Sequence, residues 1–228
     1  NGWNLEKTTP TLPAADAQPG RYTVTAVDGE KKLVSNPVPF VLDTLPECMD
    51  AEPNDEPAKA QKVTLPVIVN GRADRTGDWD VFEIDGHAGD TVVVEVNARR
   101  LGSPFDSFVK VTGADGKILA LNDDHFDVAS GLNTDHADSY LMLKLPADGQ
   151  YYVHLGDTRR QSGKDCAYRV RISPPMPDFE LRTAPSQLVM GSKGAASVNV
   201  FAVRKDGFEG PIALRFKELP QGFESSGS

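Results

Sequence analysis

Oxygen-bearing side chains are concentrated in two short stretches of the first third of the chain. The first holds three acids and one amide around a proline: Asp50, Glu52, Asn54 and Asp55. The second is the sequence DRTGDWD, some twenty residues later, and it adds three more acids: Asp74, Asp78 and Asp80. Calcium binds six to eight oxygen atoms from carboxylates, amides, backbone carbonyls and water. The two stretches could supply that number if the fold brings them together.

Two ordinary explanations compete with a metal at the first stretch. Asp and Asn are common in turns, because their side chains bond to nearby backbone groups. Asn54 or Asp55 could also cap the short helical turn that the sequence EPAKAQ predicts. The spacing does not match an EF-hand loop, so no standard motif favours the metal. The residues alone leave a calcium site, a helix cap and a solvated linker open.

A second acidic set lies in the sequence NDDHFDVASGLNTDHADS, over residues 122–139. Unstructured loops of that length are usually functional or disordered. Four of its acids are candidates for a second calcium site: Asp123, Asp124, Asp127 and Asp138. His125 and His136 offer zinc ligands instead, although their spacing fits no regular zinc motif. A polar loop whose side chains bond to its own backbone is the third interpretation.

Cys48 and Cys166 are the two cysteines of the chain. A disulfide between them would close a loop of more than a hundred residues, which stabilises a fold by ~4–5 kcal/mol in the chain-entropy model. Such a bond would also indicate an oxidising compartment. Two unrelated thiols are the alternative, and the sequence leaves the choice open because disulfide formation requires Cα atoms within about 7 Å.

The composition argues against several classes of function. The chain carries 33 Asp and Glu residues against 24 Lys and Arg residues, and its net charge of −9 disfavours binding to nucleic acid. No apolar run is long enough to span a membrane. The sequence has no G-x-S-x-G elbow, no H-E-x-x-H helix and no phosphate-binding loop. We therefore expect no enzyme in this chain.

The elements that must position the acids are predicted to be strands. Apolar residues alternate with other residues in several segments, including TVVVEVNA, YLMLKL, YYVHL and AYRVRIS. Alternation with period two is typical of strands that bury one face. Turn sequences such as GADGK and PADGQ separate these segments. The pattern predicts an all-β chain built from sandwiches.

Three segments follow from the positions of strands and prolines. Residues 1–45 read as the C-terminal part of an immunoglobulin-like module, and residues 46–174 contain about eight strands, enough for one complete sandwich. The sequence SPPMPDF predicts a stiff linker. Residues 175–228 then read as the N-terminal part of a further β-sandwich, with strands over ASVNVFAVR and GPIALRFKEL. We expect this chain to be a fragment of a larger secreted or surface protein.

The middle segment resembles a known family. The sequence EPNDEPAKAQKVTLPVIVNGRADRTGDWDVFEIDGHAGDTVVVEV, followed by LPADGQYYVHLGD, is similar to the bacterial pre-peptidase C-terminal domain. The similar features are an initial E-P-N-D, a glycine-containing strand before a D-x-D loop, the sequence AGDTV and a late G-x-Y-Y-V. They occur in that order over about residues 50–173. The resemblance implies a jelly-roll-like β-sandwich that accompanies secreted proteases and other exported proteins.

The resemblance also implies a metal site. Some members, such as the collagen-binding domains of clostridial collagenases, bind calcium where the preceding linker meets the first strands. The ligands that it implies in this chain are Glu52, Asn54, Asp55, Asp78 and Asp80, with Asp50 a weaker candidate. No aromatic cluster that would contact collagen can be transferred. The flanking segments are similar to those of large exported proteins of planctomycete-type bacteria.

The expected function is that of a non-catalytic accessory module with Ca²⁺ as its cofactor. Calcium would stabilise the module and orient neighbouring domains of the same polypeptide, in an extracellular, cell-surface or periplasmic location. The alternative is a module of an exported hydrolase that binds an extracellular polysaccharide or protein. Trp79 could then stack against a sugar, although packing is the simpler role for it.

Overall fold

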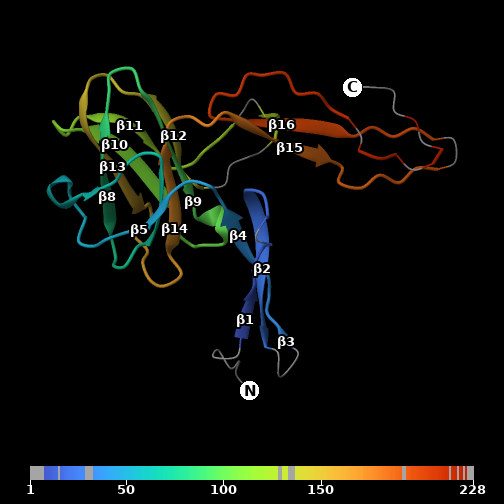
Figure 1. Cartoon of the computed structure of the whole chain (residues 1–228), viewed down its shortest axis with the longest axis horizontal. Helices are drawn as coiled ribbons and strands as arrows, with labels where there is room; N and C mark the ends of the chain where they lie inside the picture. The colour runs from blue at the N-terminus through green and yellow to red at the C-terminus, as the bar shows by residue number, and fades with distance from the viewer. Residues whose placement is uncertain are drawn as a thin grey trace. The chain divides into compact units, whose positions relative to one another are not determined.

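The computed structural model describes residues 8–14, 16–28, 33–127, 130–132, 137–191, 194–215, 217–219, 221–222 and 224. It divides into two compact units, Asn1–Met176 and Pro177–Ser228, which are considered one at a time. The chain is all-β, as the alternation predicts, and strands labelled in Figure 1 make up nearly all of its regular structure. No helix within the described ranges is long and apolar enough to cross a membrane.

β2 (Gly20–Asp28) is the centre of a four-stranded antiparallel sheet in the first part of the chain. Its three partners are β1 (Thr8–Thr11), β3 (Leu33–Val34) and β4 (Val38–Leu42). The assignment of residues 1–45 to an immunoglobulin-like module stays a prediction.

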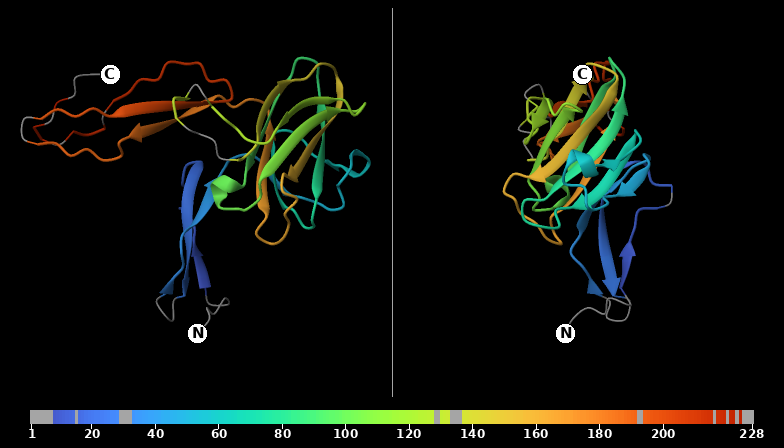
Figure 2. Two further views of the ribbon diagram at one scale, coloured as in Figure 1. Left: turned by 180° about the vertical axis from the view of Figure 1, so that it is seen from behind. Right: turned by 90° about the vertical axis from the view of Figure 1, so that its left-hand side faces the viewer.

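The β-sandwich follows and consists of two five-stranded sheets. Its strands are β5 (Glu47–Met49), β6 (Gln61–Lys62), β7 (Val67–Arg72), β8 (Trp79–Gly86), β9 (Thr91–Asn97), β10 (Ser107–Gly113), β11 (Ile118–Asn122), β12 (Tyr140–Lys144), β13 (Gly149–Asp157) and β14 (Ala167–Ser173). One sheet has the order β12-β9-β14-β7-β5 and the other has the order β11-β10-β13-β8-β6. Figure 2 shows the strands of the two sheets as facing layers.

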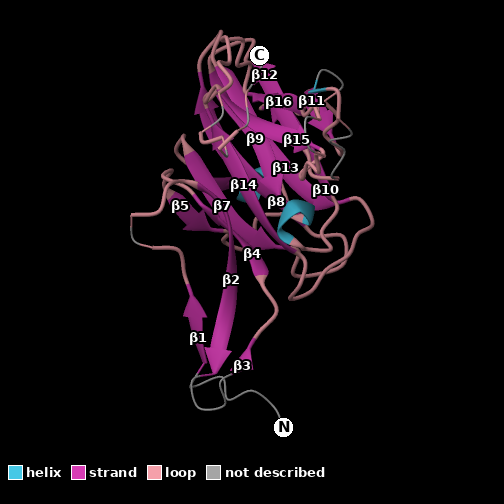
Figure 3. Ribbon diagram, turned by 90° about the vertical axis from the view of Figure 1, so that its right-hand side faces the viewer, coloured by secondary structure: helices cyan, strands magenta, loops and turns pink. Residues whose placement is uncertain are grey.

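The path of the chain through these sheets is that of a jelly roll. The eight strands β7–β14 give the spatial orders β7-β14-β9-β12 and β8-β13-β10-β11, with antiparallel neighbours throughout. This is the two-sheet arrangement of a double Greek key. β5 and β6 extend the two sheets as parallel edge strands beside β7 and β8. In the described ranges, helix is limited to single turns, among them η2 (Pro57–Lys59) and η3 (Arg99–Leu101), which Figure 3 colours cyan.

The core lies between the two sheets and contains the residues that the alternation predicts. Buried side chains from both sheets form one cluster, which includes Val69, Phe82, Ile84, Val94, Val96, Val153, Leu155, Val170 and Ile172. Each fully buried aliphatic or aromatic side chain stabilises the fold by about 1.5–3 kcal/mol relative to exposure. The sandwich therefore has a core large enough to hold polar loops at its ends in place.

The two cysteines are free, so the disulfide that the sequence left open between Cys48 and Cys166 is not formed. Cys48 on β5 pairs with Val69 on β7, whereas the carbonyl of Cys166 accepts a hydrogen bond from Ala73, beyond the end of β7. The two positions differ by four residues along β7, which is ~13 Å, and β5 and β14 flank β7 on opposite sides. This separation exceeds the reach of a disulfide.

We expect the thiols to make no covalent contribution to stability. Dithiothreitol should leave the melting temperature unchanged, and a thiol-specific reagent in denaturant should count two thiols per chain. A disulfide closing a loop of this length would contribute ~4–5 kcal/mol, which reduction would remove. A clear fall in melting temperature on reduction would therefore contradict the strand register described above.

The second unit contains one antiparallel pair, β15 (Asp178–Ala184) with β16 (Asn199–Lys205). The strand expected over ASVNVFAVR is found as β16. The strand expected over GPIALRFKEL is not present among the described residues of that segment. The linker predicted over SPPMPDF ends earlier than expected, because β15 already begins at Asp178. Whether this unit belongs to a further β-sandwich stays a prediction.

Candidate functional site

Residues 50–55, here called the acidic turn, are hydrogen-bonded to both sheets of the sandwich. The amide of Asp50 donates to the carbonyl of Asn70 on β7 at 2.9 Å. The carbonyl of Asn54 accepts a hydrogen bond from the amide of Val81 on β8 at 3.0 Å. β7 and β8 belong to different sheets. The turn therefore spans the end of the sandwich, and its side chains meet residues from both layers.

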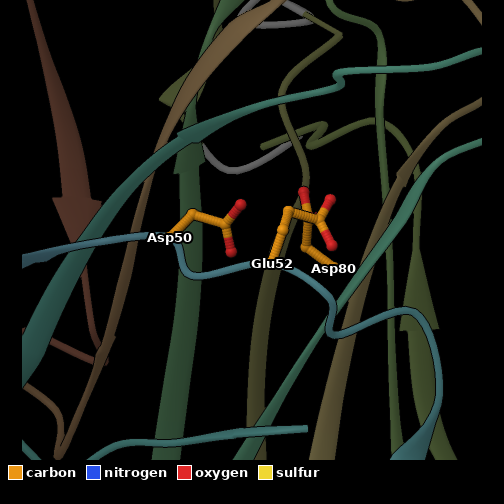
Figure 4. Close-up of side chains that lie close together, drawn as sticks. All are labelled: Asp50, Glu52 and Asp80. Carbon is orange, nitrogen blue, oxygen red and sulfur yellow. The ribbon is translucent and has the colours of Figure 1, made fainter. Parts of the chain in front are cut away.

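Three carboxylates converge beneath this turn. Asp50, Glu52 and Asp80 each place one oxygen within 4.8 Å of the others, and Figure 4 shows the carboxylates of Glu52 and Asp80 side by side with that of Asp50 turned toward them. Asp80 lies on β8 and is only 2% exposed, and alternation along the strand puts it on the same face as Phe82. A carboxylate thus stands where the strand pattern would otherwise bury an apolar side chain.

Asn54 completes the cluster. It is fully buried, its Nδ2 donates to Oδ1 of Asp50 at 2.7 Å, and its backbone amide donates to Oε2 of Glu52 at 3.0 Å. Its own Oδ1 is buried without a hydrogen-bond partner, as is Oδ1 of Asp80. An unsatisfied buried polar atom costs about 1–3 kcal/mol. The cluster thus combines three carboxylates and one amide oxygen, and two of its buried oxygens have no hydrogen-bond partner among the described residues.

The surroundings raise the pKa of two of these carboxyl groups. Burial, together with the nearby charges of Glu52 and Asp78, raises the pKa of Asp50 to about 6, although the hydrogen bond from Asn54 opposes the shift. Burial, followed by the charge of Asp50, raises the pKa of Asp80 to about 8. Both shifts follow from crowding acids in a space with little water. At neutral pH and without a cation, Asp80 therefore keeps its proton.

Gly71 on β7 makes room for the cluster. A Cβ atom at this position would lie 2.4 Å from the hydroxyl oxygen of Tyr168 and 2.7 Å from Cβ of Asp50, so a larger residue would force both apart. Tyr168 is paired with Gly71 across β14 and β7. Its hydroxyl lies near Asp80 without hydrogen-bond geometry, and burial, with the charges of Asp80 and Asp50, raises the pKa of Tyr168 well above its usual range.

Two predicted ligands are occupied by an arginine instead. Arg75 lies on the loop between β7 and β8, and its Nη2 bonds to Oδ1 of Asp55. Its Nε lies 3.3 Å from Oδ1 of Asp78, an ion pair without hydrogen-bond geometry. Oδ2 of Asp78 accepts a hydrogen bond from the amide of Asp74 at 2.7 Å. Asp55 and Asp78 flank the carboxylate cluster but are not part of it.

The helix-cap explanation of the acidic turn is wrong. The short helical turn is present as η2, but its N-cap is Glu56 and no side chain caps it. Asn54 and Asp55 bond elsewhere, to Asp50 and Arg75 respectively. The solvated-linker explanation also fails for Asn54, which is fully buried.

Asp138, from the second acidic set, has a structural role. It is fully buried and accepts four hydrogen bonds. Its Oδ1 accepts from the amides of Ala98 and Arg99, and its Oδ2 accepts from the amide and Nε of Arg100, at 2.7–3.1 Å. These bonds hold η3 against the start of β12. Asp138 therefore has no oxygen turned toward a shared metal site.

The other members of the second set do not form a group of ligands in the described part of the chain. Asp123 accepts a hydrogen bond from the amide of Asp124, and both are exposed. Asp127 is partly exposed, and His125 packs against the ring of Tyr140 at 4.8 Å. His136 lies outside the described residues. The interpretation as a loop that bonds to its own backbone agrees best with these contacts.

Sequence reasoning identified Glu52, Asn54 and Asp80 but underrated Asp50, which is central to the cluster. It missed Tyr168, whose alternation indicated only a core residue. It also missed Arg75, although an arginine between Asp74 and Asp78 is a visible signal for a local ion pair.

Comparisons with known proteins give one sequence relative and several structural likenesses. No protein-family model matches the chain. A segment of 110 residues is 38% identical to a probable subtilase-type serine protease of Deinococcus radiodurans, and it covers 46% of this chain and 14% of that protease. The chain thus corresponds to a small part of the relative's length. The comparisons give no support to the planctomycete-type likeness of the flanking segments.

Two solved structures resemble the sandwich weakly. The pre-peptidase C-terminal domain of a collagenase from Bacillus anthracis has a TM-score of 0.34 at 13% identity, covering 53% of this chain and 98% of that one. The periplasmic lysozyme inhibitor PliG of Aeromonas hydrophila has a TM-score of 0.33 at 18% identity, covering 50% of this chain and 97% of that one.

The raised pKa values predict how stability depends on pH without calcium. The folded state binds protons at Asp50 and Asp80 more tightly than the unfolded chain, so these groups contribute stability below their unfolded pKa of about 4. That stability is lost as the pH rises through about 6 and about 8. In the presence of a chelator, the melting temperature should therefore fall between about pH 4 and about pH 8, most steeply below pH 6, where both groups contribute.

The variant Asp80→Asn provides the control for this measurement. An amide cannot ionise, so the variant should show a smaller fall in melting temperature over the same pH range. Equal pH dependence in the two proteins would show that the clustered carboxylates do not control the effect.

Proposed function

We propose that the sandwich is a calcium-stabilised, non-catalytic accessory module of an exported protein. The observation that carries the proposal is the cluster of Asp50, Glu52 and Asp80, with the unpartnered buried oxygens of Asn54 and Asp80 beside it. Within the described residues, no lysine or arginine forms an ion pair with any of the three carboxylates.

The donor set suits calcium. All of the candidate ligands are oxygens, from three carboxylates and one amide, and flexible oxygen cages are what calcium prefers in proteins. The set offers no thiolate or imidazole, so it is poorly matched to zinc. A bound calcium ion would supply the positive charge that the cluster lacks.

The residues of the cluster would connect the acidic turn to the sandwich. Asp50, Glu52 and Asn54 come from the turn, whereas Asp80 comes from the core face of β8. Without a cation, the carboxylates are poorly matched neighbours and the turn is held mainly by its backbone hydrogen bonds. Neutralising the charges would fix the turn on the sandwich, and with it the direction in which the preceding residues leave the module.

The remaining parts of the proposal rest on sequence. The similarity to the pre-peptidase C-terminal domain and to part of a subtilase-type protease supports an accessory role in an exported protein. The partners would then be neighbouring domains of the same polypeptide, outside the cytoplasm. The negative net charge and the lack of catalytic motifs are compatible with a module that neither binds nucleic acid nor catalyses a reaction.

Calcium should raise the melting temperature relative to chelator. At a calcium concentration 100 times the dissociation constant, the stabilisation is ~2.7 kcal/mol, or roughly 5–10 °C for a domain of this size. Hydrogen exchange should slow in residues 46–60 and change little in the core strands. The measurements are thermal melts with calcium and with chelator, followed by hydrogen exchange under both conditions.

Two variants on β8 separate specific binding from general charge effects. Asp80→Asn should lose most of the calcium response, because it removes a charged ligand. Asp85→Asn removes an exposed carboxylate that pairs with Lys62, so it should keep the response. A melting temperature that calcium does not change, or an equal response in both variants, would contradict the proposed function.

A second candidate function is sugar binding by the outer face of the sheet that contains β8. The ring of Trp79 packs edge-on against Phe108 and lines a hollow of about 440 Å³ that also contains Thr158 and Arg160. Aromatic faces beside polar groups suit carbohydrate recognition. Lys110 lies 4.9 Å from the centre of the Trp79 ring, so a sugar that stacks there would have to replace this ammonium group.

Affinity electrophoresis in gels that contain soluble polysaccharides measures binding and tests this candidate. Trp79→Ala should abolish any retardation, whereas Met142→Ala, an exposed apolar residue on the other sheet, should not. Retardation that survives in the Trp79 variant, or no retardation at all, counts against sugar binding at this hollow.

A further inference from the structure

The acids around the acidic turn fall into two groups according to their counter-charges. The first group has no basic partner among the described residues: Asp50, Glu52 and Asp80. The second group, Asp55 and Asp78, shares a single partner, Arg75. The sequence offers all five as oxygen ligands, with Asp50 the weaker candidate, but the structure separates those that face Arg75 from those that do not.

Arg75 connects the two acids through different nitrogens of one guanidinium. Its Nη2 bonds to Asp55 on the acidic turn, and its Nε lies 3.3 Å from Oδ1 of Asp78 on the loop before β8. A guanidinium presents several donors in one plane and stays charged at all ordinary pH values, so it can serve two carboxylates at once. This geometry places one positive charge where a cation between the two acids would otherwise lie.

Burial makes this charge important for Asp78. The side chain of Asp78 is 1% exposed, whereas that of Arg75 is 58% exposed. A buried carboxylate is costly unless it is paired, and one oxygen of Asp78 already has a hydrogen bond from the amide of Asp74. The guanidinium supplies the remaining counter-charge while most of its own surface stays in water.

We propose that Arg75 is a built-in cation that occupies the space between Asp55 and Asp78, beside the cluster of Asp50, Glu52 and Asp80. Each chain therefore binds one calcium ion and not two. The inference rests on the proposed function for the ion at Asp50, Glu52 and Asp80. Arg75 then has a distinct role, because it sets the number of ions by competing for two of the potential ligands. It also ties the acidic turn to the loop before β8 when no calcium is present.

Removal of the guanidinium should open a second site. In Arg75→Ala, Asp55 and Asp78 lose their shared counter-charge. A second calcium ion can then bind where the guanidinium lies in the wild-type chain. Two carboxylates with backbone and water oxygens make a weak site, with an expected dissociation constant of about 10⁻⁴–10⁻³ M. Because Arg75 is largely exposed, its truncation leaves no internal cavity, and the remaining cost is that of the unpaired charge of Asp78, which calcium in the buffer would offset.

The experiment counts calcium ions per chain by isothermal titration calorimetry and by native mass spectrometry. The wild-type chain should bind one ion, and Arg75→Ala should bind two. Arg72→Ala is the matched control, because Arg72 lies in the same segment and is similarly exposed but pairs with Asp74 instead. This control should bind one ion. If Arg75→Ala does not fold, Arg75→Gln, which is also neutral, takes its place with the same expectation.

The outcomes distinguish this inference from the proposed function. Two ions in the wild-type chain, or one ion in both the wild-type chain and Arg75→Ala, would overturn the role of Arg75 and leave the calcium module intact. No ion bound by any of the proteins would overturn the proposed function and the inference together. Two ions in Arg72→Ala would show that the effect is one of general charge, and would also overturn the inference.

Discussion

The burial of Asp80 on the core face of β8 is the constraint on which the rest of the carboxylate cluster depends. A carboxylate at that position excludes a purely apolar end to the sandwich, and its surroundings accommodate it. Gly71 leaves space for Tyr168 and Asp50, the hydroxyl of Tyr168 lies near Asp80, and the buried Asn54 donates to Asp50. The arrangement resembles a ligand cage more than a satisfied polar core.

Other buried acids in the same sandwich show what satisfaction looks like. Asp138 accepts four hydrogen bonds that fix η3. Burial would raise the pKa of Glu95, but Arg100 and Arg171 lower it to about 2. The chain can therefore pair a buried carboxylate fully where the fold requires it. Among the described residues, no basic side chain pairs with Asp50 or Asp80. This is a specific property of the carboxylate cluster, and it favours an external cation over an accident of packing.

Much of the fold could be predicted from the sequence, because period-two alternation states which residues face the core. The site was only partly predictable. The family resemblance brought Glu52 and Asp80 together as candidates. Neither it nor the spacing could tell that Asp55 and Asp78 face Arg75, or that Asp138 bonds to the backbone of η3. These roles depend on which partner lies across a loop, and that information is not present in the identity or spacing of the acids themselves.

The position of the carboxylate cluster at the acidic turn explains why a cation there would act locally. Backbone hydrogen bonds of Asp50 and Asn54 hold the acidic turn to one strand of each sheet. Of the three clustered carboxylates, only that of Asp80 comes from the core face of a strand. Segments with few apolar contacts open at lower free energy than the core does. Charge neutralisation at the turn would therefore change the order of residues 50–55 much more than that of the jelly roll, and the path of the preceding chain would follow the turn.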